Sequence, residues 1–484
     1  MKKRNIIVAA SFMAVTALGV GMLSSCTDNF EDLNTNKTQV DPNDLPFSAQ
    51  CAEPMNYCYP PHQNMFQFWT NLTIDLYGGY FETPHGNFTN CDMGENRGHS
   101  GGMYENFYLH IFNNTRRIIT SCDAKGQKGL SGVMRVVQAC GTITATDAYG
   151  PLAYSSILEG KSEEYYDFDS QQKLYEQILD DLSTATTDIA AMSEEDKANL
   201  ATFDTWGGGD PQMWIQMANT LKLRVALRLS KREAEMKADG YDLKAIATQA
   251  ASSTLAVSGK DIVVKDQSNE LKRMFDWQDC GMNANLVTLL VGMKDPRLPL
   301  YITKNSGEIT NEKGEVTPAG STYCGIRFAS GMAQKGSSGS YGYKMSQWVG
   351  DYNVPLPIFK AAEAYFLLAE AKLRWDIGSE SVQSLYEKGI RLSIKNELAY
   401  KGSWANVDKI SDAEIDAYVN GTTHQADYVD PGNSRNNCAA VNLLGVKWDN
   451  AASKEDQLAR IQTQKYIALF PLSNEARAEQ RRTG

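Results

Sequence analysis

The chain has 484 residues, of which 42% are hydrophobic and 22% are charged, and its formal net charge is −11 at pH 7. A chain of this length can bury a sizeable core, either as one large domain or as two or three smaller ones. The acidic balance, with no basic stripe to offset it, speaks against binding to nucleic acid or to an anionic lipid surface.

The N-terminus has the pattern of an export signal. A cationic start, Lys2 to Arg4, precedes an apolar run over residues 6–23, and Leu23-Ser24-Ser25-Cys26 follows. The start and the run are typical of a signal peptide, and the ending resembles the lipobox of bacterial lipoproteins. We therefore expect cleavage after residue 25 and attachment of fatty acyl chains such as palmitate to Cys26, which anchor a protein without crossing the membrane. An uncleaved signal anchor and a plain secretory signal are the alternatives.

The polar segment that follows, residues 26–45, reads as a lipidated tether, because it is rich in Asn and Asp. The chain contains nine cysteines, irregularly spaced after Cys26. A protein of this size does not need disulfides, so we expect buried free thiols. If a pair forms, Cys51 and Cys58 are the closest in sequence.

Helical periodicity dominates the rest of the chain, and Asp169 with Gln172 suggests a capping box at the start of the clearest helix. Lys222, Arg224 and Arg228 fall outside the apolar stripe of their helix, and a solvated edge or buried ion pairs are favoured over an anion site. Apolar residues recur at helical spacing over residues 66–80, 104–119, 130–148, 174–189 and 214–229.

Residues 305–343 differ from this pattern, because Gly, Ser and Thr are frequent and Glu312 to Glu315 suit the turn of a hairpin. A long irregular stretch of this kind is often used for binding. Helical spacing returns over residues 362–373 and 382–390. The Ala-rich first segment and the Tyr/Gly/Ile second segment suggest a tetratricopeptide-type pair of helices.

Catalytic motifs are not found in the sequence. HExxH, paired CxxC, GxSxG and GxxxxGK[ST] are all missing, and Gly207 to Gly209 lack the later glycine of a dinucleotide loop. The spacing of His85, Asp92 and His99 fits no metal-ligand rule. We therefore predict no catalytic residue, no cofactor and no metal site.

A turn at residues 427–433 contains Asp427, Asp430 and Asn433, which could hold calcium but lack EF-hand spacing, so a solvated turn is favoured.

The aromatic residues, 8 Trp, 23 Tyr and 16 Phe, are the better indication of function. Sugar rings stack their C–H faces on aromatic rings, while their hydroxyls need polar groups nearby. Most aromatics on helical stripes belong to the core, but those in or beside loops are free for a ligand. The candidates for ligand contact are Tyr80, Phe81, Trp206, Trp277, Tyr323, Tyr341, Tyr343 and Trp348.

Several segments, in chain order, resemble the SusD/RagB family of nutrient-binding outer-membrane lipoproteins. They are the segment from Phe30 to Asn36, Thr146-Asp147-Ala148-Tyr149-Gly150-Pro151-Leu152, Asp295-Pro296-Arg297-Leu298, the stretch from Ala362 to Ala371, the stretch from Ile461 to Phe470, and Arg481-Arg482-Thr483-Gly484. The chain departs from the family pattern at Lys37, where proline is usual, and at Arg477, where tryptophan is usual. It also stops at Gly484, where relatives continue, so we expect a shortened C-terminus.

The resemblance implies a mainly α-helical fold in one domain over residues 46–484, with tetratricopeptide-type helix pairs, a loop-rich ligand face and a few short β-hairpins. It also implies a protein that binds and does not catalyse. Such a protein captures an oligosaccharide or another nutrient outside the outer membrane and acts as the lid of a SusC-like TonB-dependent transporter. The family has no fixed ligand motif, so no ligand residue is implied. A surface glycoside hydrolase and a tetratricopeptide-type interaction scaffold are the alternative functions.

Overall fold

The computed structural model describes residues 45–59, 62–88, 96–160, 165–264, 267–400, 407 and 409–484. The expected signal peptide, Cys26, the tether up to residue 44, and Asp92 lie outside the described residues. Residues 51–484 form one compact unit, and helix α3, Phe47–Tyr57, crosses its start.

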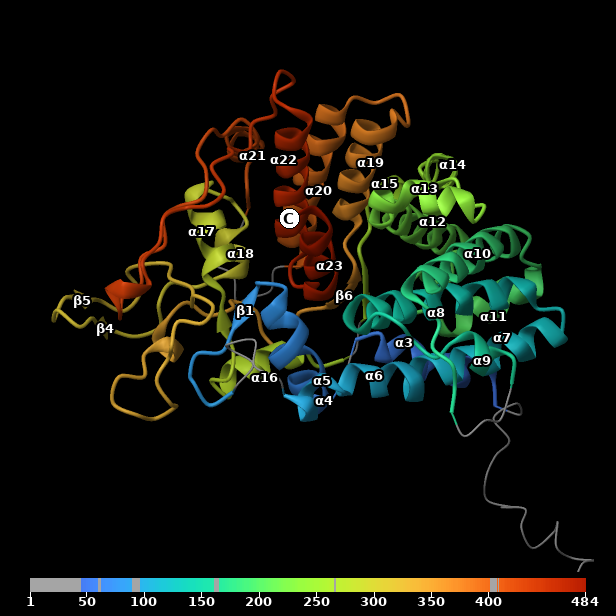
Figure 1. The fold of residues 1–484 in the computed structure, drawn as a ribbon, viewed down its shortest axis with the longest axis horizontal. Helices are drawn as coiled ribbons and strands as arrows, with labels where there is room; N and C mark the ends of the chain where they lie inside the picture. The colour runs from blue at the N-terminus through green and yellow to red at the C-terminus, as the bar shows by residue number, and fades with distance from the viewer. Residues whose placement is uncertain are drawn as a thin grey trace, which may run out of the picture. The chain divides into compact units, whose positions relative to one another are not determined.

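The fold is mainly α-helical, as expected (Figure 1). The longer helices are α7 (Asn113–Ala124), α8 (Lys128–Tyr149), α10 (Gln171–Ala190), α11 (Glu194–Phe203), α12 (Pro211–Arg228), α19 (Ala361–Trp375), α20 (Val382–Tyr400), α22 (Lys454–Leu469) and α23 (Ser473–Thr483). Shorter helices are α4 (Gln63–Phe66), α5 (Arg97–Ser100), α6 (Gly102–Asn106), α9 (Ser155–Leu158), α13 (Glu233–Ala238), α14 (Leu243–Ala250), α15 (Leu255–Ser258), α16 (Glu270–Asp276), α17 (Ala284–Gly292), α18 (Leu298–Tyr301) and α21 (Asp412–Val419). Two π-helical segments, η2 (Gln67–Asp75) and η4 (Phe107–Phe112), and three 3-10 turns, η5 (Ser230–Arg232), η6 (Gly342–Lys344) and η7 (Ser434–Asn436), complete the helical elements.

The strands are short and form three antiparallel pairs within the described residues. They are β1 (Phe81–Glu82) with β3 (Gly281–Met282), β2 (Ile262–Val264) with β6 (Leu356–Phe359), and β4 (Ile309–Thr310) with β5 (Val316–Thr317). Ile309 pairs with Thr317 and Thr310 with Val316, so the hairpin predicted around Glu312 to Glu315 is confirmed. Its turn contains Gly314 at a φ of +80°, a conformation that glycine adopts without strain.

Helix α10 shows how the apolar pattern sets the packing. Its stripe from Leu174 to Ile189 is buried as predicted, and it packs against α8 on one side and α12 on the other. The predicted cap is displaced by one residue. Ser170, not Asp169, caps the helix by accepting a hydrogen bond from the Lys173 amide, since Asp169 instead binds the Lys173 ammonium and the Ser155 amide.

Helices α19 and α20 pack along each other, which confirms the predicted tetratricopeptide-type pair. Their close approach depends on Gly389 in α20. A β-carbon at this position would lie 2.8 Å from the buried ring of Phe366 in α19. Small residues at the contact therefore bring the two helix axes together.

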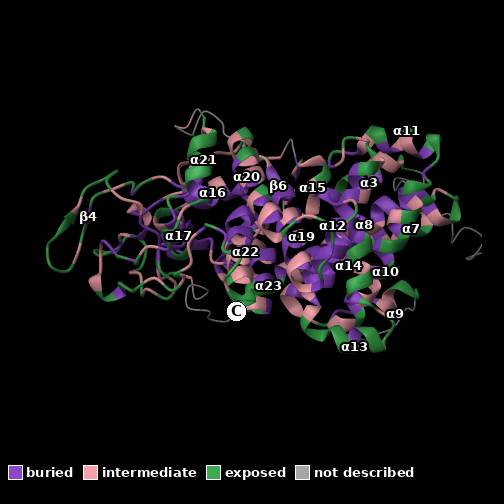
Figure 2. Ribbon diagram, turned by 90° about the horizontal axis from the view of Figure 1, so that it is seen from above, coloured by how far each residue is buried: buried purple, intermediate pink, exposed green. Residues whose placement is uncertain are grey.

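The core follows the inner faces of these helices. Figure 2 shows buried residues along α8, α12, α19 and α22, whereas the β4 hairpin is largely exposed. One large cluster of buried apolar side chains extends from Phe66 to Ala476 and joins segments from both ends of the described chain.

The seven cysteines of the described residues are all free. Cys51 lies on α3 and Cys58 follows it directly, so the two are about 10 Å apart along the helix direction. The Cα atoms of a disulfide lie within about 7 Å of each other. The helix therefore excludes the pair that was closest in sequence.

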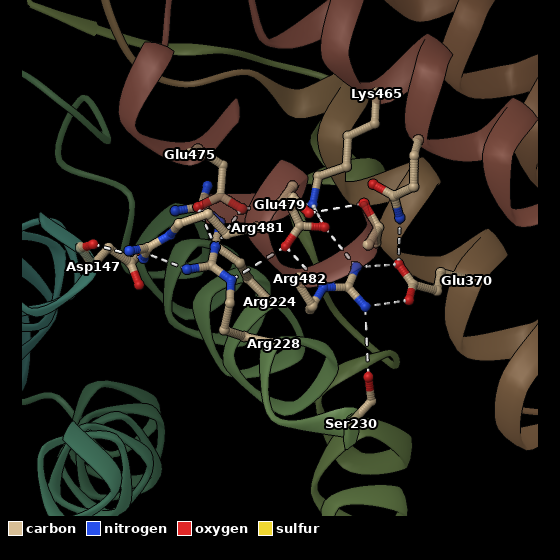
Figure 3. Close-up of polar contacts among 12 residues, drawn as sticks. Asp147, Arg224, Arg228, Ser230, Glu370, Lys465, Glu475, Glu479, Arg481 and Arg482 are labelled. Carbon is tan, nitrogen blue, oxygen red and sulfur yellow. Dashed lines mark hydrogen bonds and ion pairs between the residues drawn. The ribbon is translucent and has the colours of Figure 1, made fainter. Parts of the chain in front are cut away.

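A network of buried ion pairs, the ion network, joins helices that are far apart in the chain (Figure 3). It has its centre on α12, where Arg224 binds Glu363 of α19 and Arg228 binds Asp147 of α8 and Glu475 of α23. The sequence left open whether these arginines are solvated or paired. The structure shows that they are paired, since each binds a carboxylate and both side chains are less than 10% exposed.

The second half of the ion network is carried by the last helix. Arg482 makes two hydrogen bonds to Glu370 of α19, both 2.7 Å, and two to Glu479, at 3.2 and 2.6 Å. The Lys465 ammonium lies 3.2 Å from Glu479 (Figure 3). Breaking a buried pair by removing one partner leaves an uncompensated charge and costs about 3 to 5 kcal/mol. Most of the segments that resemble the SusD/RagB family therefore contribute side chains that hold the helices together.

Lys222, the third cation on α12, is also buried but binds an amide and not a carboxylate. Its ammonium lies 3.2 Å from Gln249 Oε1, and burial lowers the pKa of this lysine.

One buried amide holds the start of the loop-rich segment. Asn305 donates from Nδ2 to the carbonyl groups of Gly307 and Pro318, and its Oδ1 accepts hydrogen bonds from the amides of Ser321 and Thr322. The Asn305 side chain therefore connects the two ends of the loop over residues 307–321, which contains the hairpin of β4 and β5.

Candidate functional site

Four of the eight aromatic candidates are part of the core. Tyr80 and Phe81 have no exposed surface, and Trp206 and Trp348 are buried as well. The Tyr80 ring stacks on Tyr466 at 4.6 Å between centroids, and its hydroxyl donates to the Tyr466 carbonyl. Their ring faces are therefore covered in this structure. In the sequence these residues stand beside loops, but Tyr466 covers Tyr80 from 386 residues away and Phe275 packs on Phe81 from 194 residues away.

The other four candidates, Trp277, Tyr323, Tyr341 and Tyr343, are half-buried and keep accessible surface. Three of them lie in the loop-rich segment between α18 and β6. Trp277 caps the C-terminus of α16. We call these four residues the aromatic set, and their rings are more exposed than those of the four buried candidates.

Tyr341 is held rigidly by the turn at residues 430–433. Its hydroxyl donates to Asp430 Oδ2 at 2.9 Å, and its ring lies so close to Gly432 that a β-carbon there would be 2.5 Å from the ring. Burial and the Asp430 carboxylate raise the pKa of Tyr341. Its phenol therefore stays neutral and its ring is fixed in one orientation.

Asp430 is occupied by its own turn. Its Oδ1 accepts hydrogen bonds from the amides of Gly432 and Asn433, and its Oδ2 also accepts one from Asn436 Nδ2 at 2.7 Å. Asp427 is exposed, as a solvated turn predicts, but Asp430 is buried and its carboxylate is used by the turn itself. Within the described residues, no group of three or more His, Cys, Asp or Glu could hold a metal ion.

The backbone of Tyr343 is fixed by two side chains, because its carbonyl accepts hydrogen bonds from Ser306 Oγ at 3.2 Å and Gln347 Nε2 at 3.3 Å. Tyr323 is flanked by the Lys304 ammonium, 6.0 Å from the ring centroid. A cation at this distance is attracted to the ring face. Both rings are thus displayed on a backbone that hydrogen bonds and packing hold in place.

A cluster of ionisable side chains beside Trp277 holds the loop-rich segment through Lys335. Sequence reasoning missed this cluster. Asp279 accepts hydrogen bonds from Lys335 Nζ at 3.0 Å and pairs with His85 Nε2 at 3.1 Å. Burial alone would raise the pKa of Asp279, but His85 and Lys335 outweigh it and the pKa is lowered. The sequence carries no signal for this cluster, because Asp279 lies 194 residues from His85.

The histidines considered for a metal are used elsewhere. His85 contacts Asp279, whereas the ring of His99 stacks on Phe68 with 4.6 Å between centroids. The two histidine rings therefore have different partners. Asp92 lies outside the described residues.

Two of the cavities within the described residues have lining residues from several helices. The first has about 130 Å³, is mainly apolar, and is lined by residues such as Tyr59, Phe66, Phe107 and the buried carboxyl of Asp75. The second has about 550 Å³ and mixed polarity. Its walls are Thr205, Trp206, Gly207, Gly208, Asp210, Met213, Gly259, Lys260, Asp261, Val263, Asn396, Ala399 and Tyr400.

The second cavity has Trp206 in common with the predicted site. Sequence reasoning missed its other polar walls, Asp261, Asn396 and Tyr400, because they come from segments up to about 190 residues away. Sequence reasoning did exclude the glycines at 207–209 as a dinucleotide loop, and in the structure they turn around the side chain of Asp204.

None of the helices in the described ranges is long and apolar enough to cross a membrane.

Solved structures share this fold over most of the chain. A chitin-binding SusD homologue from Flavobacterium johnsoniae has 26% sequence identity and a TM-score of 0.75, over 90% of this chain and 85% of that one. A SusD homologue from Bacteroides vulgatus has 24% identity and a TM-score of 0.74, over 90% and 85% of the two chains. A SusD-like protein from Bacteroides thetaiotaomicron has 24% identity and a TM-score of 0.74, over 90% and 86%.

The comparison with curated proteins finds no match. A family model described as SusD-like, "Susd and RagB outer membrane lipoprotein", matches residues 29–484. The resemblance noted in the sequence is thus confirmed, and the chain belongs to the SusD-like family.

Proposed function

We propose that the protein binds an oligosaccharide at the outer surface of the outer membrane and passes it to a SusC-like TonB-dependent transporter, for which it acts as a lid. The observation that carries this proposal is the likeness to the chitin-binding homologue, at 26% identity over 90% of the chain. The family description as outer membrane lipoproteins supports the location. Acylation of Cys26 would provide the anchor.

The aromatic set is the proposed place of capture. Trp277, Tyr323, Tyr341 and Tyr343 offer ring faces for the C–H faces of a sugar, and the three tyrosines add hydroxyl groups for hydrogen bonds. The contacts of Asp430, Asp279 and Asn305 hold the supporting loops before a ligand arrives. A preformed site loses less conformational entropy on binding.

The test of this site is a titration of the purified protein with chitin oligosaccharides and a panel of other glycans by calorimetry. We expect Tyr323→Ala and Tyr343→Ala each to weaken binding about three- to tenfold, since each removes one stacking face. Tyr165→Ala is the matched control, because this tyrosine is 80% exposed on the segment before α10. Equal affinity in the two loop variants and the parent protein would contradict the proposed site.

The partner and the anchor need a separate experiment. We expect a tagged protein to recover a β-barrel transporter from detergent-solubilised outer membranes. Cys26→Ser should release the protein from the membrane fraction, because the acylated thiol is lost. Recovery without a transporter would contradict the role as a lid, while release of reducing ends from the bound glycan would favour the hydrolase alternative.

A further inference from the structure

The cavity of about 550 Å³, the polar cavity, lies where three connections meet. One wall is the loop from α11 to α12, with Trp206 and Asp210. A second is the segment between α15 and β2, with Lys260 and Asp261, and the third is the last turn of α20. The aromatic set contributes none of its lining residues.

Trp206 brings an unused donor to this cavity. Its side chain is only 5% exposed, and its indole Nε1 has no hydrogen-bond partner. The neighbouring indole of Trp214 stacks on it at 5.7 Å between centroids but is satisfied, since its Nε1 donates to Asp204 Oδ2 at 2.8 Å. Buried polar groups are nearly always paired, so an unpaired indole in a cavity wall indicates a missing acceptor.

The loop that presents Trp206 is built rigidly. The Asp204 carboxylate accepts hydrogen bonds from the amides of Trp206, Gly207 and Gly209 at 2.9, 2.7 and 2.8 Å. A β-carbon on Gly207 would lie 2.8 Å from that carboxylate, so the turn needs glycine there. The indole is therefore held in one place by contacts that do not involve a ligand.

The opposite wall carries acceptors and an amide. Asp261 has a side chain that is 1% exposed, and its Oδ1 accepts hydrogen bonds from the Ala361 amide and from Asn396 Nδ2 at 2.7 and 2.8 Å. Its Oδ2 lies 3.7 Å from the Lys360 ammonium, which is beyond hydrogen-bonding distance. This oxygen has no hydrogen-bond partner within the described residues.

These groups define the chemistry of an occupant. The Trp206 donor needs an acceptor and the Asp261 carboxylate favours a donor, and a hydroxyl group provides both. The Lys360 ammonium is shared between Asp261 at 3.7 Å and Glu397 at 2.6 Å. The carboxylates of Asp210, Asp261 and Glu397 thus outnumber the ammonium groups of Lys260 and Lys360, and this charge disfavours an anionic ligand. A volume of about 550 Å³ lies in the range of small-molecule sites.

We propose that the polar cavity is a second binding site, for a neutral hydroxylated ring of the size of a mono- or disaccharide, with Trp206 donating to a ligand oxygen and Tyr400 forming part of the wall. This site is independent of the aromatic set and of any transporter, so the proposal of a second site can be tested separately from the proposed function.

The test uses saturation-transfer NMR on the purified protein with glucose, galactose, mannose, N-acetylglucosamine and their disaccharides, each up to about 10 mM. Ala399 is an exposed alanine in the last turn of α20 that lines the cavity, so Ala399→Trp should fill the cavity without disturbing the core. Ala190→Trp is the matched control, an exposed alanine at the end of α10. We expect at least one sugar to bind, and Ala399→Trp to weaken that binding about tenfold or more while Ala190→Trp leaves it unchanged.

Trp206→Phe keeps a ring but removes the indole donor, and it should weaken the same sugar about fivefold. If this buried variant does not fold, as judged by circular dichroism, the Ala399→Trp result decides alone. Tyr323→Ala and Tyr343→Ala separate the two sites, because they should leave binding in the polar cavity unchanged. The proposal is overturned if no sugar of the panel binds, if Ala399→Trp binds it as the parent protein does, or if only the loop variants lose it.

Discussion

Arg297 and Asp295 form a two-pronged ion pair that is completely hidden from solvent. The guanidinium donates from Nε to Asp295 Oδ1 at 2.9 Å and from Nη2 to Oδ2 at 2.6 Å, and neither side chain has exposed surface. The remaining guanidinium donors reach Ser393 of α20 and Gln464 of α22. The segment Asp295-Pro296-Arg297-Leu298, which resembles a recurrent family element, therefore joins helices and is not a ligand site.

Arg297→Met removes one half of this pair. We expect the free energy of unfolding to fall by about 3 to 5 kcal/mol, because the Asp295 carboxylate is left buried without its cation. The measurement is urea denaturation followed by circular dichroism. Arg391→Met is the control, since Arg391 and Asp416 form an exposed pair and such pairs contribute at most about 1 kcal/mol. Equal losses in both variants would contradict the assigned role.

The ion network predicts a loss of stability in acid. Burial raises the pKa of Glu475, but Arg224, Arg228 and Lys465 together outweigh it and lower the pKa from its ordinary value of 4.5 to about 2. A lowered pKa means that the stabilisation is fully present above pH 4.5 and is lost as the pH falls through about 2. The urea midpoint of the protein should therefore fall across this window.

Glu475→Gln is the variant that assigns this loss. It should be less stable at pH 7 by on the order of 3 kcal/mol, and its urea midpoint should change less between pH 5 and pH 2 than that of the parent protein. A parallel pH dependence in the two proteins would show that other carboxyl groups dominate.

Asp75 has the opposite effect. Burial beside the apolar cavity raises the pKa of its carboxyl from 3.8 to about 6, and hydrogen bonds from Ser473 and Asn71 offset only part of this. A raised carboxyl pKa destabilises the fold above pH 6 and has no effect below pH 3.8. Asp75→Asn should therefore stabilise the protein by about 1 to 3 kcal/mol at pH 8. The gain should vanish as the pH falls below 4, which paired urea titrations at the two pH values would show.

Gly389→Ala tests the contact between α19 and α20. The added β-carbon would lie 2.8 Å from the buried Phe366 ring, so we expect a net loss of about 1 to 2 kcal/mol in the free energy of unfolding. Gly98→Ala is the control, since the nearest atom would be 3.5 Å away and the residue is exposed on α5. There alanine should be neutral or stabilising by up to about 1 kcal/mol. A stabilising Gly389→Ala would mean that the helices do not need this close approach.

Local features of the fold could be predicted from the sequence. The β4 hairpin depends on a few adjacent residues around Gly314, and the stripe from Leu174 to Ile189 repeats at helical spacing, so both were found. The predicted cap of α10 was wrong by one residue, because Asp169 and Ser170 are both good capping residues. The contacts of Asp169 with Ser155 and Lys173 leave Ser170 as the cap.

The candidate site was harder to predict, because it depends on contacts between distant segments. Tyr80 and Tyr341 look alike in the sequence as tyrosines beside loops. Tyr80 is covered by Tyr466, 386 residues later, whereas Tyr341 remains half-buried beside Asp430. No local pattern records which loop residue will be covered by another segment.

The side chain of Asn305 makes four hydrogen bonds that hold both ends of the loop over residues 307–321 together. All four partners are main-chain groups. The Gly307 carbonyl lies at the first end, and the Pro318 carbonyl and the amides of Ser321 and Thr322 lie at the second end. The length and the side chains of the loop between these two ends, which includes the exposed hairpin, can thus change while Asn305 keeps the two ends in place. The surface that this hairpin presents can therefore vary while the helical frame keeps its packing.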